Sequence, residues 1–388
     1  MIEARLAEAV DLQVGFAFSS RDFTSEPSRY RLLRNDNLGH GVTRWSGGTW
    51  LNDAVEVDRR YHLNEGDLVV AMDRPWIASG VKYAEVRAHD LPALLVQRVA
   101  RLRVRPGIEQ RYLKYVIAGR NFAEYIQAVQ TGTAIPHISG ASLAGFRFPK
   151  HDQRDQRAIA EILGSLDDKI ASNAELARTA DDLARAYFAQ MCRDAVGRPL
   201  SSVASFTNGR AFTKDASGSG RVVIRIAELN SGIGPSTVRS EAVVADQYTA
   251  RPGDILFAWS GSLTIARWYR PDAIVNQHIF KVEALGGLPC WLIFQLLRAK
   301  LADFQGIAAD KATTMGHIQR RHLDEVVSVP NAQVIGAQDA LMTGLWDRAL
   351  AAEQESLILA KLRDTLLPHL MSGRLTVRDA GKTVSDAV

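Results

Sequence analysis

An internal duplication constrains the fold of this chain more than any other feature. Residues 6–18 (LAEAVDLQVGFAF) align with residues 200–212 (LSSVASFTNGRAF), so that Gly15 faces Gly209 and Phe18 faces Phe212. Further matches follow in the same order and end with TAIPHI at 133–138 against TTMGHI at 313–318. Such self-similarity predicts two tandem copies of one structural unit of roughly 190 residues.

Each copy starts with short β-rich runs and ends with a helical pattern. Runs such as 67–71 and 254–258 are separated by Gly, Pro, Asn and Asp, which is typical of strands in a mixed α+β domain. Residues 152–191 contain no proline, and their apolar residues follow a heptad template, which predicts a long helix. Residues 341–370 repeat this pattern until Pro368 and Gly373. Alanines along the seam favour close approach of two helices.

The fold class that follows is α+β, with two similar globular domains separated by two long helices that pair as an antiparallel coiled coil with pseudo-two-fold symmetry. About 40 residues at 1.5 Å per residue give a rod of roughly 60 Å. The predicted boundaries are 1–150 for the first domain, 151–195 for the central helix, 196–332 for the second domain, 333–375 for the C-terminal helix and 376–388 for a tail.

Positive charge is concentrated in the two globular parts. Residues 1–150 and residues 196–330 each carry a net charge of +4, whereas residues 151–195 carry −3 and residues 331–388 carry −1. Binding of a polyanion by the globular domains requires this distribution, because phosphate groups are neutralised by Lys and Arg. The pattern therefore indicates that both domains bind nucleic acid.

Motifs for catalysis are missing from the sequence. There is no G-x-x-x-x-G-K-[ST] phosphate loop, no G-x-G-x-x-G turn and no Asn/Asp-Pro-Pro-aromatic run of the kind that would hold a flipped adenine. Cys192 and Cys290 have no ligand-type neighbours, so neither a zinc site nor a disulfide framework is expected. The sequence also has no signal-peptide pattern and no apolar run long enough to span a membrane, which predicts a cytoplasmic location.

Several motifs together resemble one known family. They are GFAF at 15–18, LDDKI at 166–170 followed by LARAYF at 183–188, TTMGHI at 313–318, and LRDTLLPHLMSG at 362–373. In their order, and with the duplication, they resemble the specificity subunit of type I restriction-modification systems over nearly the full chain. The copies differ at DRPW (73–76) and SGS (260–262), which is expected if the two domains recognise different half-sites.

The resemblance implies a non-catalytic DNA-recognition subunit in which each target-recognition domain reads one half of a bipartite double-stranded DNA sequence. The paired helices would set the spacer and dock two methyltransferase subunits, and restriction subunits would join this complex. No cofactor would bind to the chain itself; S-adenosylmethionine would bind to the methyltransferase, and ATP and Mg to the restriction subunit. Two alternatives stay open: a stand-alone sequence-specific DNA-binding protein, and an enzyme such as a nuclease with scattered carboxylates.

Candidate DNA contacts are chosen by side-chain chemistry, because forked donors and amides read base edges whereas Lys, Arg, Ser and Thr also contact phosphates. No catalytic or metal-binding residue is expected. Ion pairing at a strand edge is the competing role for Arg34 and Arg225. The candidates are Arg21, Arg34, Lys82, Arg98 and Thr133 in the first copy and Lys214, Arg225, Arg267, Lys311, Thr313, Thr314 and His317 in the second.

Overall fold

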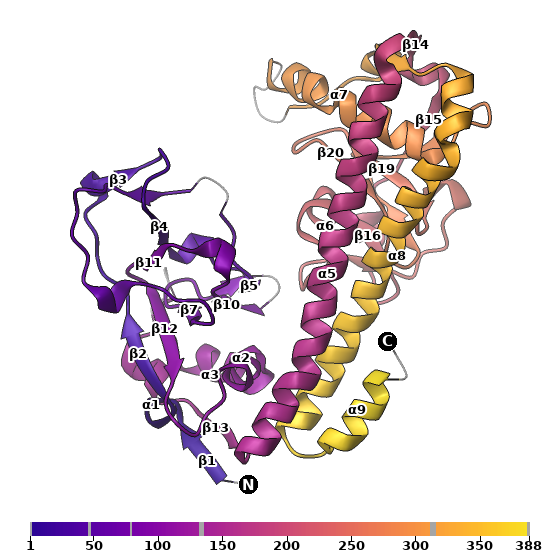
Figure 1. The fold of residues 1–388 in the computed structure, drawn as a ribbon. Helices are drawn as coiled ribbons and strands as arrows, with labels where there is room; N and C mark the ends of the chain where they lie inside the picture. The colour runs from indigo at the N-terminus through magenta and orange to yellow at the C-terminus, as the bar shows by residue number, and fades with distance from the viewer. Residues whose placement is uncertain (1, 46–47, 78–79, 132–135, 311–315, 386–388) are drawn as a thin grey trace. The chain divides into compact units, whose positions relative to one another are not determined.

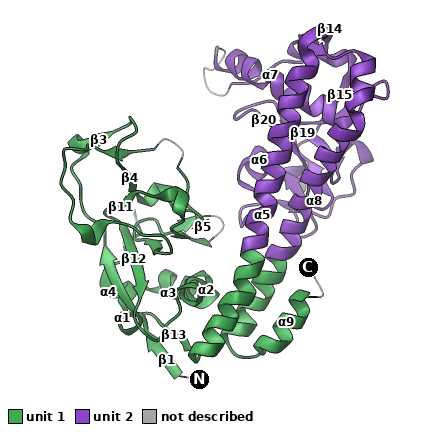
Figure 2. Ribbon diagram, in the orientation of Figure 1, with its two compact units in different colours: residues 1–167, 361–388 green, residues 168–360 purple. Residues whose placement is uncertain are grey.

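The structure is a computed structural model that describes residues 2–45, 48–77, 80–131, 136–310 and 316–385. It divides into two compact units, one formed by residues 1–167 and 361–388 and the other by residues 168–360 (Figure 2). The division falls inside both long helices. Each unit therefore contains one α+β domain and one piece of each helix.

The domain of the first unit has a five-stranded sheet and a four-stranded sheet, and its terminal strands form a separate antiparallel pair. Three short helices follow the last strand of the larger sheet. The strand order of the larger sheet is β2 (Val10–Val14), β12 (Val99–Val104), β7 (Leu68–Ala71), β10 (Tyr83–Glu85) and β5 (His40–Gly41). The smaller sheet contains β11 (Ala93–Leu95), β4 (Tyr30–Leu33), β6 (Trp50–Leu51) and β3 (Phe23–Thr24), and the separate pair is β1 (Ile2–Arg5) with β13 (Arg147–Lys150). The helices are α2 (Gln110–Ala118), α3 (Arg120–Val129) and α4 (Gly140–Ala144).

The domain of the second unit repeats this plan with fewer strands. Its first sheet has the order β15 (Ala204–Asn208), β22 (Ile279–Ala284), β19 (Ile255–Ala258) and β20 (Thr264–Arg267). Its second sheet has the order β17 (Arg239–Ser240), β16 (Arg221–Ile224), β21 (Ala273–Val275) and β18 (Thr249–Ala250). The separate pair is β14 (Val196–Pro199) with β23 (Val326–Val329), and the helices are α6 (Ile226–Ser231) and α7 (Cys290–Asp310).

The topologies of the two domains confirm the duplication that the sequence predicts. Strands β2, β12, β7 and β10 correspond in order and direction to β15, β22, β19 and β20. The one parallel pair near the hinge of the two sheets also recurs, as β4 with β11 and as β16 with β21. Apolar strands such as β7 and β19 are buried on both faces, because each lies in the middle of its sheet.

The two long helices are α5 (Gln153–Met191) and α8 (Ala332–Met371), and they lie side by side (Figure 1). Asp152 caps the first helix through a hydrogen bond from the Asp155 amide (2.8 Å), and Asn331 caps the second. Alanines form the seam in the second unit, as predicted, with Ala177 and Ala180 packed against Ala349 and Ala352.

Paired polar residues fix the antiparallel direction of these helices. In the second unit the buried Asn173 side chain donates to Glu355 (2.7 Å), and in the first unit the Arg363 guanidinium donates to Asp167 (2.7 Å). Higher numbers on α5 therefore face lower numbers on α8. A buried amide at a seam position also selects one register, because any shift would leave it without its partner.

Residues 376–388 were expected to form a tail, but most of them form helix α9 (Val377–Ser385). Thr376 caps this helix, because its hydroxyl accepts a hydrogen bond from the Asp379 amide (3.2 Å), and Ala380 is buried. The sequence signal was a Thr-x-x-Asp cap after Gly373. Within the described residues, no helix combines the length and the apolar character that a membrane crossing requires.

Each domain is joined to the helices of its own unit at an equivalent place, but with different chemistry. In the first unit, Lys114 of α2 lies between Glu85 of β10 (3.2 Å) and Asp167 of α5 (2.9 Å). In the second unit, Arg267 of β20 lies over Trp346 of α8, with the guanidinium carbon 4.7 Å from the ring centre. A charged junction in one copy thus corresponds to a cation–π junction in the other.

Candidate nucleic-acid interface

A tight approach of two backbone segments explains the matched glycines Gly15 and Gly209. A Cβ atom on Gly15 would lie 2.1 Å from the carbonyl oxygen of Val96, and one on Gly209 would lie 2.2 Å from that of Asn276. No side chain fits at either position unless the backbone moves. The glycines therefore hold the end of β2 or β15 against the turn that follows β11 or β21.

We expect Gly209→Ala to lower the free energy of unfolding by about 1–3 kcal/mol, because the new methyl group would overlap main-chain atoms that are part of a sheet. Gly306→Ala in α7 is the matched control. A Cβ there meets no atom within 4 Å, and alanine favours a helix over glycine. Urea unfolding measures both variants, and a smaller loss for Gly209→Ala than for Gly306→Ala would contradict this account.

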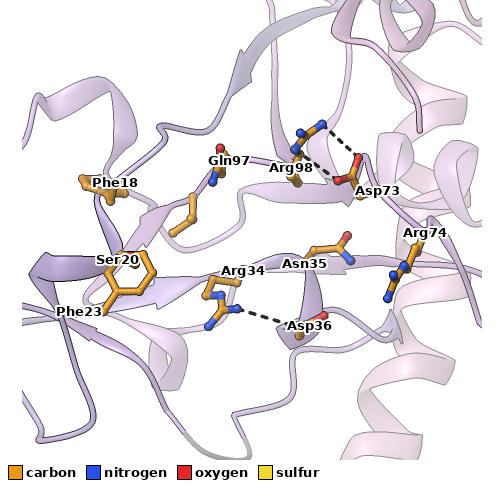
Figure 3. A pocket seen from close by; sticks show the side chains of 11 residues that line it. Phe18, Ser20, Phe23, Arg34, Asn35, Asp36, Asp73, Arg74, Gln97 and Arg98 are labelled. Carbon is orange, nitrogen blue, oxygen red and sulfur yellow. Dashed lines mark hydrogen bonds and ion pairs between the residues drawn. The ribbon is translucent and has the colours of Figure 1, made fainter. Parts of the chain in front are cut away.

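A hollow with a volume of about 470 Å³ opens on the first domain (Figure 3). Two turns and the ends of several strands line it, and cationic side chains surround the open space. We call it the domain 1 hollow. Its lining residues are Phe18, Ser20, Phe23, Arg34, Asn35, Asp36, Asp73, Arg74, Val96, Gln97 and Arg98.

Two carboxylates only partly balance the cations of the domain 1 hollow. Asp36 lies 3.7 Å from the Arg34 guanidinium, and Asp73 lies 3.3 Å from that of Arg98. Arg74 also lines the hollow. This excess of positive charge, together with forked guanidinium donors in an open concave surface, suits the binding of phosphates and base edges.

Lys82 adds to the same positive field. Burial lowers the pKa of its ammonium group, the neighbouring positive charge of Arg74 lowers it further, and the negative charge of Asp36 opposes both effects. These influences place Lys82 near the rim where Arg74 and Asp36 lie. A phosphate placed there would stabilise the ammonium form and would favour binding.

The structure thus gathers the sequence-predicted residues Arg34, Lys82 and Arg98 at one place. Arg21 is exposed and directly follows Ser20, which lines the hollow. Sequence reasoning missed Asn35, Arg74 and Gln97. The conserved spacing of the repeat could have indicated Gln97, whereas nothing in the sequence marked Arg74. Thr133 lies outside the described residues.

His137 forms a pair with Asp73, with 2.5 Å between Nδ1 and the carboxylate oxygen. Histidine–carboxylate pairs also occur in hydrolases, where the histidine activates a hydroxyl or a thiol. Among the described residues, no hydroxyl or thiol is hydrogen-bonded to the His137 ring. In the second copy Ser260 occupies the place of Asp73 opposite His317, so the acid partner is not repeated. The pair orients Asp73 and, through it, Arg98.

Arg225 was expected to contact DNA, and the structure corrects this. Its guanidinium donates to both carboxylate oxygens of the buried Glu228 (2.7 and 3.1 Å) and to the carbonyl of Ser236. This hydrogen bonding raises the pKa of Arg225. The corresponding partner of Arg34 is the neutral Asn37, which accepts only from the Arg34 backbone. Arg225 is therefore an ion-pair residue, and Arg34 keeps its guanidinium at the hollow.

Arg267 was also expected to contact DNA, and this expectation is wrong. Its side chain is only 2% exposed, and it forms ion pairs with Asp181 of α5 (3.2 Å) and Glu353 of α8 (2.9 Å). No phosphate can reach a guanidinium that is enclosed in this way. The residue joins the second domain to both helices of its unit.

The remaining candidates in the second domain are partly accounted for. Lys214 is exposed on the short helix Phe212–Asp215, and His317 is exposed opposite Ser260. Both have the accessibility that a DNA contact needs. Lys311, Thr313 and Thr314 lie outside the described residues.

Comparison with known proteins gives a consistent result. The chain is 35% identical over 165 residues to the type I restriction enzyme EcoAI specificity subunit of Escherichia coli and 30% identical over 168 residues to the MjaVIII specificity subunit of Methanocaldococcus jannaschii. These matches cover 42% and 43% of this chain but only 27% and 39% of the relatives' own lengths. No protein-family model matches the chain.

A solved structure shares the fold. The S subunit of a type I restriction-modification system from M. genitalium superposes with a TM-score of 0.57 at 16% sequence identity, covering 95% of this chain and 96% of that one. The resemblance stated from the sequence motifs is thereby confirmed, as is the α+β fold with two domains and paired long helices.

Proposed function

We propose that this chain, which is similar in sequence and in fold to type I specificity subunits, is the DNA-recognition subunit of a type I restriction-modification complex. Each α+β domain would read one half of a bipartite DNA sequence. The observation that carries the proposal is the duplicated domain: its first copy has a cationic hollow formed by Arg34, Arg74, Lys82 and Arg98, and both copies are joined to one helical pair.

The helical pair would separate the two half-sites. With 39 residues in α5 and 40 in α8, each helix has a length of about 60 Å at 1.5 Å per residue. This exceeds the roughly 34 Å of one turn of DNA, which sets the half-site distance for many two-fold readers. We place the two domains at opposite ends of the pair, so that its length sets the spacer.

The outward faces of the helices would dock the catalytic partners. Leu183, Leu341 and Ile358 are large apolar side chains on α5 and α8 that stay exposed, at 43%, 41% and 62%. Exposed apolar side chains on otherwise polar helices favour a protein partner. We assign this surface to two methyltransferase subunits, with restriction subunits joining the complex.

The chemistry would reside in those partners. S-adenosylmethionine would bind to the methyltransferase, and ATP and Mg to the restriction subunit, whereas this chain would bind no cofactor, contribute no catalytic residue and act in the cytoplasm. Among the described residues, no group of three or more His, Cys, Asp or Glu side chains could hold a metal ion.

Selection from random DNA tests this function. The chain, assembled with its methyltransferase partner, is expected to enrich sequences with two defined parts and a gap of fixed length. Enrichment of one continuous motif, or of none, would contradict the proposal. Tight binding of a specific site by the isolated chain would instead favour a stand-alone DNA-binding protein.

Arg21→Ala should weaken binding of specific and random DNA by similar factors, and it should reduce the slope of log K against log salt by about 1, as expected for the loss of one phosphate contact. Arg120→Ala is the matched control. Arg120 is also exposed, but it lies on α3 and pairs with Glu124. Titrations from low to high salt measure the slope, and equal slopes for the two variants would reject this role for Arg21.

A further inference from the structure

The turn after β11 and the turn after β21 are held by the same backbone hydrogen bonds. We call residues 96–99 and 276–279 the pinned turns. Gly15 donates to Val99 (2.9 Å) as Gly209 donates to Ile279 (3.0 Å). Two further equivalent bonds, listed by donor and acceptor, are Gln97 to Phe16 (2.8 Å) with Gln277 to Arg210 (2.9 Å), and Met72 to Arg98 (2.8 Å) with Trp259 to His278 (3.1 Å). Both turns are thus fixed to the two flanking strands.

The third residue of each pinned turn has a left-handed backbone although it is not glycine. The φ angle is 71° at Arg98 and 74° at His278. This conformation is unfavourable for residues with a Cβ, and glycine would adopt it without strain. A large polar side chain occurs there in both copies, so the position serves a purpose other than stability.

The pinned turns present side chains that are suited to reading bases. Gln97, Arg98 and Gln277 are exposed, and His278 is half-buried. Within the described part of the chain, neither glutamine amide forms a side-chain hydrogen bond. Glutamine can bond both hydrogen-bonding atoms on the major-groove edge of adenine, and arginine can do so for guanine.

Neighbouring groups hold the third residue in each turn. Asp73 fixes the Arg98 guanidinium at 3.3 Å and is itself bound by His137. The His278 ring lies 5.2 Å from the Trp259 ring, and its buried Nδ1 has no hydrogen-bond partner. Discrimination between bases needs donors whose position is fixed to a fraction of an ångström, and a pinned backbone with an oriented side chain provides this.

Resting on the function proposed above, we propose that the pinned turn is the base-reading element of each domain. Gln97 and Gln277 supply the same amide to both half-sites. Arg98 and His278 occupy the equivalent next position and differ, so they make the two half-sites differ. The chemistry assigns a guanine contact to Arg98 in the half-site of the first domain.

The test exchanges the differing residues within the full chain, assembled with its methyltransferase partner. Arg98→His is expected to change the preferred base at one position of one half-site, and His278→Arg to change one position of the other half-site. Arg98→Gly should reduce discrimination at that position about 10- to 100-fold, which is the usual range for the loss of one bidentate base contact. Selection from random DNA measures all three variants.

Thermal unfolding separates this role from a structural one. Glycine relieves the left-handed backbone, so Arg98→Gly should unfold at the same or a higher temperature than the wild type while it loses discrimination. A lower unfolding temperature with unchanged discrimination would show that Arg98 serves the fold and would overturn the inference. If the wild type selects two half-sites and both exchange variants select the same ones, the inference fails alone. If the wild type itself selects no bipartite sequence, the proposed function fails.

Discussion

Replacement of Arg267 by alanine is expected to lower the free energy of unfolding by about 3–5 kcal/mol, because the change leaves two carboxylates without their buried partner. Asp181 and Glu353 both face the Arg267 guanidinium, at 3.2 and 2.9 Å, and Trp346 covers it. For a unit of this size, such a loss corresponds to a fall of roughly 10 °C in unfolding temperature. Calorimetry or urea unfolding measures it.

Arg251→Ala provides the matched control in the same unit. Arg251 also forms an ion pair, with Asp246, but both side chains are exposed. Solvent screens such pairs, so little change in stability is expected. Similar losses for Arg267→Ala and Arg251→Ala would contradict the role of Arg267 as the junction between the second domain and its helices.

The Arg267 variant should also depend on pH in a defined direction. Burial raises the pKa of Glu353 above its usual 4.5, and Arg267 opposes this shift. Without Arg267 the pKa rises further, so the folded variant binds a proton more tightly than the unfolded chain does. That stabilising proton is present at low pH and is lost as pH rises through the folded-state pKa. The penalty should therefore be smaller at acidic pH than at pH 7.

Lys114→Met is expected to cost about 3–5 kcal/mol at pH 7, because Lys114 is the equivalent junction residue of the first unit. Its side chain is 8% exposed and lies between Glu85 and Asp167. Burial pushes the pKa of Asp167 up, but Lys114 and Arg363 outweigh burial and hold it below 3.8. Methionine keeps most of the apolar volume of the stem and removes only the charge.

The sign of the pH dependence follows from this lowered pKa. A carboxyl group with a depressed folded-state pKa stabilises the fold above its unfolded pKa, near 3.8, and this contribution is lost as pH falls through the folded value. The difference between wild type and Lys114→Met should therefore be largest at neutral pH and should shrink below about pH 4. Urea unfolding across this range tests it. Lys150→Met, on an exposed lysine of β13, is the control, and an equal loss there would contradict the junction.

Much of the fold was predictable because the duplication supplies its own alignment. The heptad pattern located α5 and α8, and the alanines of the seam occur at the predicted contact. By contrast, Arg267 looked like any other arginine in a strand, because its two acidic partners lie 86 residues away on either side in the sequence. Which strand residue meets which helix residue depends on tertiary packing, and no local pattern encodes it.

The candidate site shows the same division. Arg34 and Arg225 are equivalent, and the residue three positions later separates their roles: Asn37 leaves the guanidinium of Arg34 at the hollow, whereas Glu228 binds that of Arg225. That difference was present in the sequence. The left-handed backbone at Arg98 and His278 was not, because neither residue type requires it.

Exchange of one domain tests the central claim most directly. Residues 1–150 are replaced by the corresponding segment of a specificity subunit with a different known target, and the assembled complex is used to select sites from random DNA. The account predicts that one half-site changes to that of the donor while the other half-site and the gap stay the same. A change in both half-sites, or in neither, would contradict two independent readers joined by one helical pair.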